Sequence, residues 1–115
     1  MSKDLSISVL MDFYGELLTD KQKDTLELYY DRDYSLAEIA EDMDISRQGV
    51  RDFIKRGEKQ LYEFEEKLEM VKKYNDISSH IAKLEKLIND MRSDSFLKNK
   101  EKALDVIEVI KSELY

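Results

Sequence analysis

The 115-residue chain has no cysteine, no proline, no tryptophan, one histidine and only three glycines. Without cysteine it forms no disulfide, zinc finger or iron–sulfur cluster. No apolar run approaches the roughly 18 residues of a transmembrane helix, and the first ten residues lack the pattern of a secretory signal. We therefore expect a cytoplasmic protein that does not insert into a membrane. The absence of proline, with 39% charged residues, fits an all-α fold.

Catalytic groupings are also scarce. The single histidine, His80, has no cysteine or paired carboxylate near it in the sequence, which favours a partly exposed helical residue over a ligand or base. There is no glycine-rich phosphate loop and no Ser/His/Asp arrangement. The pair Asp31/Asp33 could hold a cation, but no further ligands follow at loop spacing, so a solvated turn is favoured. We expect no enzyme, no cofactor and no metal.

The net charge of −7 argues against general adhesion to nucleic acid, but the charge is uneven. Residues 46–61 form the only locally basic segment. They carry two acidic side chains, Asp52 and Glu58, against five basic ones, Arg47, Arg51, Lys55, Arg56 and Lys59. An acidic body with one basic helix favours specific, salt-sensitive contact with DNA over non-specific coating.

Two capping boxes divide the N-terminal half into helices. A first helix is expected over Leu5 to Leu18, with a broad apolar face. Thr19-x-x-Gln22 predicts the start of a second helix, from Asp20 to about Asp31. These helices would supply the core against which a later motif packs.

A helix-turn-helix pattern follows. Ser35-x-x-Glu38 predicts a helix of about two turns. Asp44-Ile45 is then a tight turn, and Ser46 is a good N-cap for a longer helix. Ala40 stands where two steeply crossing helices need a small residue, so we expect it to be buried. Any two amphipathic helices of a bundle would share part of this pattern, but small residue, turn and outward charge agree here.

The longer helix separates an apolar face from a charged one. Val50, Ile54, Gly57 and Leu61 fall on one side at helical spacing. On the other side, arginine can pair with guanine and glutamine with adenine, and both bind phosphate. Lysines further along would meet phosphate, although a solvated helix face is an equal alternative for each. The candidate DNA-binding residues are Ser46, Arg47, Gln48, Arg51, Asp52, Lys55, Arg56 and Lys59.

The segment LLTDKQKDTLELYYDRDYSLAEIAEDMDISRQGVRDFIKRGEKQL, residues 17–61, resembles the promoter-reading C-terminal domain of bacterial sigma factors. Together with DFYGELLT at 12–19, the chain resembles the YlxM family more closely, and more weakly beyond about residue 74. YlxM proteins are small bacterial proteins encoded beside the genes of the signal recognition particle. The resemblance implies a sigma-region-like helix-turn-helix in a DNA-binding regulator connected with that pathway.

The match to sigma factors is partial at the reading positions. Arg47 and Arg51 match the arginines of that family. Gln48, Gly49 and Asp52 stand where sigma factors usually have glutamate, arginine and glutamine. The promoter sequence that sigma factors read is therefore not implied. No sigma-like polymerase-binding or strand-opening segment precedes the motif, so a stand-alone sigma factor is not expected.

Beyond residue 61 the helical pattern continues as a heptad stripe through Phe64, Leu68 and Val71. We expect the long helix to end at Asn75-Asp76, a second helix with Ile81, Leu84 and Ile88 in line, a turn at Ser93-Asp94-Ser95, and a last helix from about Leu97 to Leu114. Val106 and Val109 lie off the last stripe. Stripes that the first helices cannot cover predict a homodimer through this extension.

The sequence thus predicts a helix-turn-helix DNA-binding domain at 1–61 and a helical packing or dimerisation extension at 62–115. The predicted function is binding of double-stranded DNA in transcriptional regulation. The alternative is a non-enzymatic interaction protein that binds a protein or RNA component of the signal recognition particle pathway without reading DNA. A third option is structured RNA on the same basic stripe.

Overall fold

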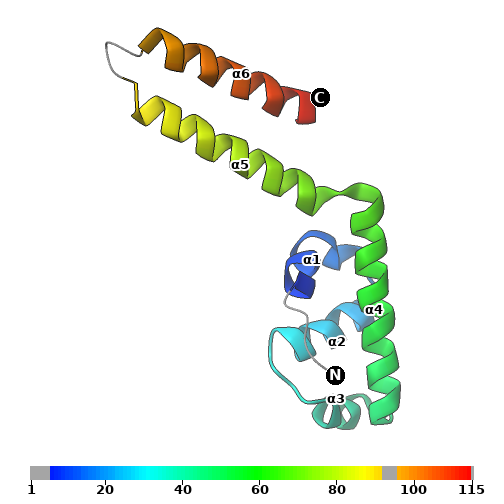
Figure 1. The fold of residues 1–115 in the computed structure, drawn as a ribbon. Coiled ribbons are helices and arrows are strands. Elements are labelled where there is room, and N and C mark those ends of the chain that lie inside the picture. Colours follow the sequence, from blue (N-terminus) through cyan, green and yellow to red (C-terminus); the bar gives the residue numbers. More distant parts are fainter. Residues whose placement is uncertain (1–5, 92–95, 115) are drawn as a thin grey trace. The chain divides into compact units, whose positions relative to one another are not determined.

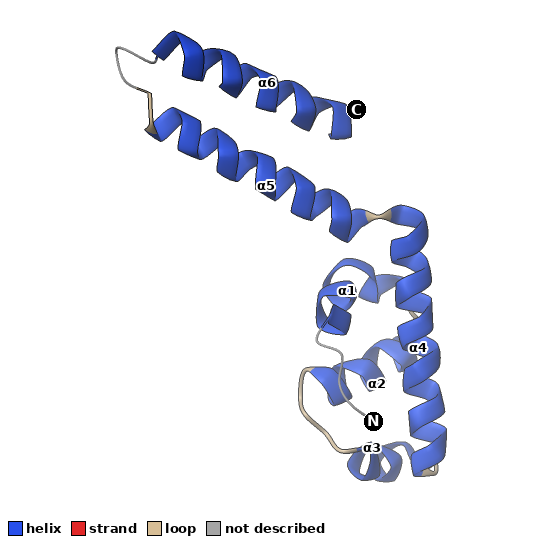
Figure 2. Ribbon diagram, viewed as in Figure 1, coloured by secondary structure: helices blue, strands red, loops and turns tan. Residues whose placement is uncertain are grey.

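The structure is a computed structural model, and it describes residues 6–91 and 96–114. The described residues form helices joined by short loops, with no strand among them, as the sequence predicts (Figure 2). Two compact units make up the chain, Met1–Val71 and Lys72–Tyr115. In chain order (Figure 1) the helices are α1 (Ser6–Tyr14), the short 3-10 helix η1 (Gly15–Leu17), α2 (Asp20–Tyr30), α3 (Leu36–Met43), α4 (Arg47–Leu68), α5 (Met70–Asn89) and α6 (Phe96–Leu114).

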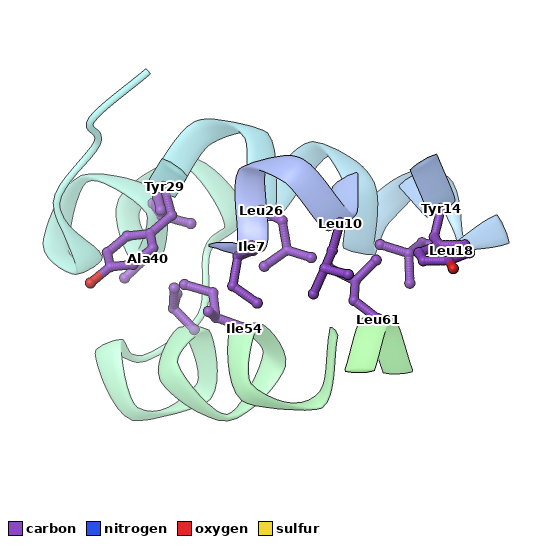
Figure 3. Packing of buried hydrophobic residues seen from close by; sticks show 11 residues of the cluster. Ile7, Leu10, Tyr14, Leu18, Leu26, Tyr29, Ala40, Ile54 and Leu61 are labelled. Carbon is purple, nitrogen blue, oxygen red and sulfur yellow. The ribbon is translucent and has the colours of Figure 1, made fainter. Parts of the chain in front are cut away.

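The first unit is built around α4, which α1, α2 and α3 all contact. Its core gathers apolar side chains from each of these helices (Figure 3). The predicted apolar face of α4 is confirmed, because Val50, Ile54, Gly57 and Leu61 are all buried. The other buried apolar residues of the cluster are Ile7, Leu10, Tyr14, Leu18, Leu26, Tyr29, Ile39 and Ala40.

Both predicted capping boxes form. The hydroxyl of Thr19 accepts the N–H of Gln22 at 3.2 Å, and the Gln22 side chain accepts the N–H of Thr19 at 3.3 Å. Ser35 and Glu38 repeat the arrangement at 3.1 and 3.2 Å. Each box satisfies N–H groups that the first helical turn leaves free, so α2 and α3 start where their local sequence directs.

The first helix is shorter than predicted. It becomes the 3-10 helix η1 after Tyr14, and the chain is extended at Leu18. Leu18 is buried whereas Leu17 is 57% exposed. The turn changes the direction of the chain, so residues spaced for one continuous helix no longer share a face. Leu5, the expected start, lies outside the described residues.

The expected break at Asn75-Asp76 is wrong, because both residues lie inside α5. The long helix instead ends at Leu68, and Glu69 takes a left-handed backbone with φ of 52°. Neither glycine nor proline marks this position. The cause is tertiary: the Tyr14 hydroxyl accepts the N–H of Met70 at 3.0 Å and donates to Glu65 at 2.5 Å.

The Glu65 carboxylate completes this junction by accepting the N–H of Val71 at 3.0 Å. Tyr14 and Glu65 therefore cap the first turn of α5, the role that a local N-cap residue fills elsewhere in the chain. Phe64 and Val71, predicted to extend past the core, in fact pack against it. Only Leu68 of that predicted stripe remains 44% exposed. Residues 62–71, assigned to the extension by sequence, therefore belong to the first unit.

The second unit is a hairpin in which α6 runs back beside α5 (Figure 1). The Asn99 amide of α6 donates to the carbonyl of Asp90, just after α5, at 3.1 Å, and Nε2 of His80 lies 3.2 Å from Oε1 of Glu113. Ala103 is its one buried residue among those described. Val106, which lies off the predicted stripe of the last helix, is half-buried. The predicted turn at 93–95 lies outside the described residues.

Candidate nucleic-acid interface

The turn between α3 and α4 sets the direction of the candidate reading helix. Asp44 adopts a left-handed backbone with φ of 56°. The N–H of Ile45 bonds the carbonyl of Ala40 at 3.1 Å, and the N–H of Asp44 bonds that of Glu41 at 3.3 Å. This is the Schellman arrangement, which closes a helix and redirects the chain sharply. Ala40 is buried, as predicted, where α3 meets the core.

Ser46 begins α4 and has a structural role. Its hydroxyl oxygen accepts the N–H of Gly49 at 3.0 Å, which makes it the N-cap of the helix. The side chain therefore orients the first turn of α4. The next two residues, Arg47 and Gln48, are exposed at the helix N-terminus, where the unpaired N–H groups add partial positive charge.

The exposed face of α4 carries six of the eight candidate residues. Gln48 and Asp52 are one turn apart, and the Gln48 amide donates to the Asp52 carboxylate at 3.0 Å. This bond fixes the Gln48 side chain along the helix and occupies one of its donors. The exposed members are Arg47, Gln48, Asp52, Lys55, Arg56 and Lys59.

Arg51 differs from these six, and the expectation that it points outward is wrong. Its side chain is half-buried, and its Nε is sealed from solvent without a hydrogen-bond partner among the described residues. The reason is its position, about 60° round the helix from buried Ile54 at 100° per residue. Replacing Arg51 would disturb packing as well as any contact with DNA, so Arg47 is the cleaner probe.

An aromatic side chain that the sequence analysis missed lies on the edge of this face. The guanidinium of Arg56 is 5.6 Å from the ring centre of Phe53, and the Lys21 ammonium of α2 is 5.8 Å from it. The half-buried ring attracts both cations by cation–π interaction. Lys21 therefore adds a basic group from another helix. The spacing of Phe53 and Arg56 was the available sequence signal for half of this cluster.

The basic character fades along α4. From the third turn on, Lys55 and Lys59 border a shallow hollow that is also lined by glutamates and one tyrosine, Glu58, Tyr62, Glu63 and Glu66. Glu58 also accepts a hydrogen bond from the Tyr30 hydroxyl. The surface of α4 is thus most positive in the N-terminal half of the helix, the half that enters the major groove in helix-turn-helix proteins.

The helix before the turn has the opposite charge. Between residues 33 and 46 there is no lysine or arginine, while Glu38, Glu41, Asp42 and Asp44 are all exposed. In helix-turn-helix complexes this first helix crosses the DNA backbone. Carboxylates there would face phosphates and weaken general attraction to DNA. The interface therefore combines a basic reading helix with an acidic supporting helix.

The described residues show neither a metal site nor a membrane span. Within residues 6–91 and 96–114, no three histidine or acidic side chains are grouped to hold a metal ion. Among the helices of those ranges, none is both long and apolar enough to span a bilayer. His80, expected to be partly exposed, is 21% exposed and paired with Glu113, a partner on α6 that the sequence did not reveal.

A short capped helix, a left-handed turn over a buried alanine, and a longer helix with a charged outer face define a helix-turn-helix protein. Residues 1–107 match the family described as "Putative helix-turn-helix protein, YlxM / p13 like". The chain belongs to this family, UPF0122, as the sequence resemblance indicated.

Relatives from several bacteria support the assignment. A UPF0122 protein of Thermoanaerobacter sp. (strain X514) is 52% identical over 88 residues, 76% of this chain and 75% of the relative. Another from Halalkalibacterium halodurans is 41% identical over 108 residues, which cover 94% of this chain and 99% of the relative. A third, from Bacillus cereus (strain AH187), is 47% identical over 90 residues, 78% of this chain and 82% of the relative.

Proposed function

We propose that the protein is a transcriptional regulator that binds double-stranded DNA through the first half of α4. The observation that carries the proposal is the capped helix-turn-helix with an exposed, basic N-terminal face on its second helix. The N-terminal residues of a recognition helix are those that reach base edges in the major groove. No catalytic step is part of this function.

The exposed residues divide by the chemistry they offer. Arg47 and the Gln48–Asp52 pair lie in the first two turns and would contact base edges, where arginine favours guanine and a carboxylate accepts from cytosine. Lys55, Arg56 and Lys59 lie further along and would contact phosphates. Asp52 repels phosphate, so it contributes to selectivity more than to affinity.

The regulatory role includes two further parts. A single short reading helix makes few contacts, and a homodimer would supply a second half-site. The connection with the signal recognition particle pathway rests on the resemblance to YlxM proteins. It would make genes of that pathway the first targets to examine.

The test is selection of bound duplexes from a random pool, followed by titration at about 50 and about 200 mM salt. We expect an enriched sequence whose affinity falls steeply with salt. Arg47→Ala should weaken binding to that sequence by about 1–3 kcal/mol. Lys67→Ala removes the same charge from the last turn of α4 and should leave binding within about threefold. A pool with no enriched sequence, or equal losses in the two variants, would overturn the proposal.

A second candidate is an interaction protein that binds a component of the signal recognition particle pathway without reading DNA. The acidic surface of α3 favours it, since this surface opposes a DNA backbone but suits a basic partner. Glu41→Gln with Asp42→Asn separates the two. A DNA-binding protein should gain about two- to fivefold in general DNA affinity for each charge removed. An interaction protein should lose affinity for its partner and gain none for DNA. Binding of the same variant to the RNA of the signal recognition particle is measured as well.

A further inference from the structure

The α5–α6 hairpin buries too few apolar side chains to explain how it stays folded. Of its described residues only Ala103 is buried, although both helices carry isoleucine, leucine and valine along their length. Units near roughly 40 residues rarely fold on one hydrophobic core without a staple or a partner. This chain has no cysteine to supply a disulfide. The hairpin needs a surface that covers its exposed apolar side chains.

One side of the hairpin carries a groove with charged side chains along its border. This groove of about 440 Å³ has Leu87 and Val106 at its floor and a border of charged side chains from both helices, Lys83, Lys86, Asp90, Lys102 and Asp105. Because one groove joins these residues, they mark the same side of α5 and α6. A partner placed here would have to desolvate five charges.

The opposite side carries four exposed aliphatic side chains, Ile81, Ile88, Leu97 and Leu104, which we call the hairpin face. At 100° per residue these positions lie roughly 120–160° round their helices from the groove residues, which places them together on the other side. They are 44, 54, 79 and 53% exposed. Each helix contributes a pair spaced by seven residues, the repeat by which helices pack in bundles.

Charge indicates which molecule covers this face. The second unit, Lys72–Tyr115, carries nine basic and eight acidic side chains, a formal charge of +1. The first unit carries ten basic and eighteen acidic, a charge of −8, which completes the −7 of the chain. Copies that approach through their first units repel one another, whereas the hairpins meet without net repulsion. A basic protein or a nucleic acid would gain little electrostatic attraction from a unit that is nearly neutral overall.

The size of the face also suits a second copy. The part of α5 in this unit, residues 72–89, is roughly 27 Å long at 1.5 Å per residue. Two helices about 10 Å apart then present a surface of several hundred Å². Mutual burial would approach the roughly 800 Å² per partner of a standard stable interface.

We propose that the hairpin face packs against the hairpin face of a second copy to form a four-helix antiparallel bundle. A two-fold axis parallel to the helices places α5 of one copy over α6 of the other, with opposite directions. Ile81 and Ile88 then pack against leucines of the partner's α6. This inference rests on the dimeric part of the proposed function and names its surface, but it does not depend on DNA being read.

The test measures the mass of the full chain by light scattering at micromolar concentration. The unmodified protein should have the mass of two chains. The variant Ile81→Glu/Leu104→Glu should have the mass of one, because it places charges in the bundle while replacing only exposed side chains. Val109→Glu is the matched control. Val109 is 43% exposed on the groove side of the same helix, so this variant should keep the two-chain mass.

A one-chain mass for the unmodified protein, or a two-chain mass for the double variant, would overturn the proposal. If the double variant loses its helical circular dichroism signal, it has unfolded and its mass does not test the interface. Hydrogen exchange of the unmodified protein then tests whether the hairpins associate. Amides of α5 and α6 should become better protected as concentration rises, and unchanged protection would overturn the proposal. DNA binding is measured on the same samples, so a monomer that still enriches a half-site would refute the dimer and keep the reading helix.

Discussion

The two units use the same local sequence signals and reach different degrees of burial. Both consist of helices with apolar residues at heptad or near-heptad spacing. In the first unit, eleven apolar side chains form one buried cluster (Figure 3). In the described part of the second, Ala103 alone is buried. The difference lies in the number of neighbours, because α4 is packed against three other helices and α5, beyond its first turn, against α6.

This contrast shows what amphipathic spacing does and does not specify. An apolar stripe identifies the side of a helix that tends to be buried. Whether that side is buried depends on the rest of the chain or on a partner. In α4 the stripe through Ile54 and Leu61 is satisfied within the unit. In α5 the stripe of Ile81 and Ile88 is left exposed, although its spacing is the same.

Truncating one isoleucine in each stripe should give the largest difference in stability between the two units. Ile54 has no exposed surface in the core, so Ile54→Ala should lower the free energy of unfolding by about 2–5 kcal/mol. Ile81→Ala, measured below the concentration at which the chain associates, should lower it by less than about 1 kcal/mol. Urea unfolding of both variants provides the comparison. Equal losses would show that the hairpin is covered within its own chain.

Overpacking at the helix crossing should have the next largest effect. Ala40 is 8% exposed where α3 enters the core, and Ala40→Leu adds three carbons there, at an expected cost of about 1–3 kcal/mol. Ala82→Leu in exposed α5 makes the same change where space is open, and it should cost almost nothing. A stable Ala40→Leu protein would mean that α3 can move aside.

The third comparison concerns the junction at which the first unit ends. Tyr14→Phe removes the hydroxyl that accepts from Met70 and donates to Glu65, and should destabilise the first unit by about 1–2 kcal/mol. The Met70 amide should lose protection in hydrogen exchange. Tyr29→Phe is a control on another buried tyrosine of the cluster, and protection of Met70 should not change in that variant.

The same tyrosine predicts a dependence on alkaline pH. Burial, followed by the hydrogen bond to the Glu65 carboxylate, raises the pKa of Tyr14 above its ordinary value of 10.0. Because the folded pKa is the higher one, the stabilisation is fully present below pH 10 and is lost as pH rises through the folded pKa. Stability measured above pH 10 should therefore fall more steeply in the unmodified protein than in Tyr14→Phe. Parallel curves would assign the slope to other groups.

Much of the first unit follows from sequence because its signals are local. The boxes at Thr19 and Ser35 and the small residue Ala40 each act within a few residues, and the structure bears out all three. The end of α4 could not be predicted, because it depends on Tyr14 and Glu65, which are 51 residues apart in the chain. The half-burial of Arg51 was missed for a similar reason. Helical spacing separates inside from outside, but it does not resolve side chains at the boundary between them.

The smallest expected effect tests what holds the bend after α4, the backbone conformation of Glu69 itself or the contacts of Tyr14 and Glu65. Glu69 has a left-handed backbone that costs a side-chain residue roughly 1–2 kcal/mol and glycine almost nothing. Glycine, however, loses roughly 0.5–1 kcal/mol more backbone entropy on folding. Glu69→Gly should therefore stabilise the first unit by about 0.5 kcal/mol. Asp44→Gly, at the corresponding left-handed position after α3, should stabilise it less, because aspartate tolerates this conformation better than glutamate. If Glu69→Gly destabilises the protein while Met70 stays protected, the bend is held by the capping contacts of Tyr14 and Glu65 with no strain at Glu69 to relieve.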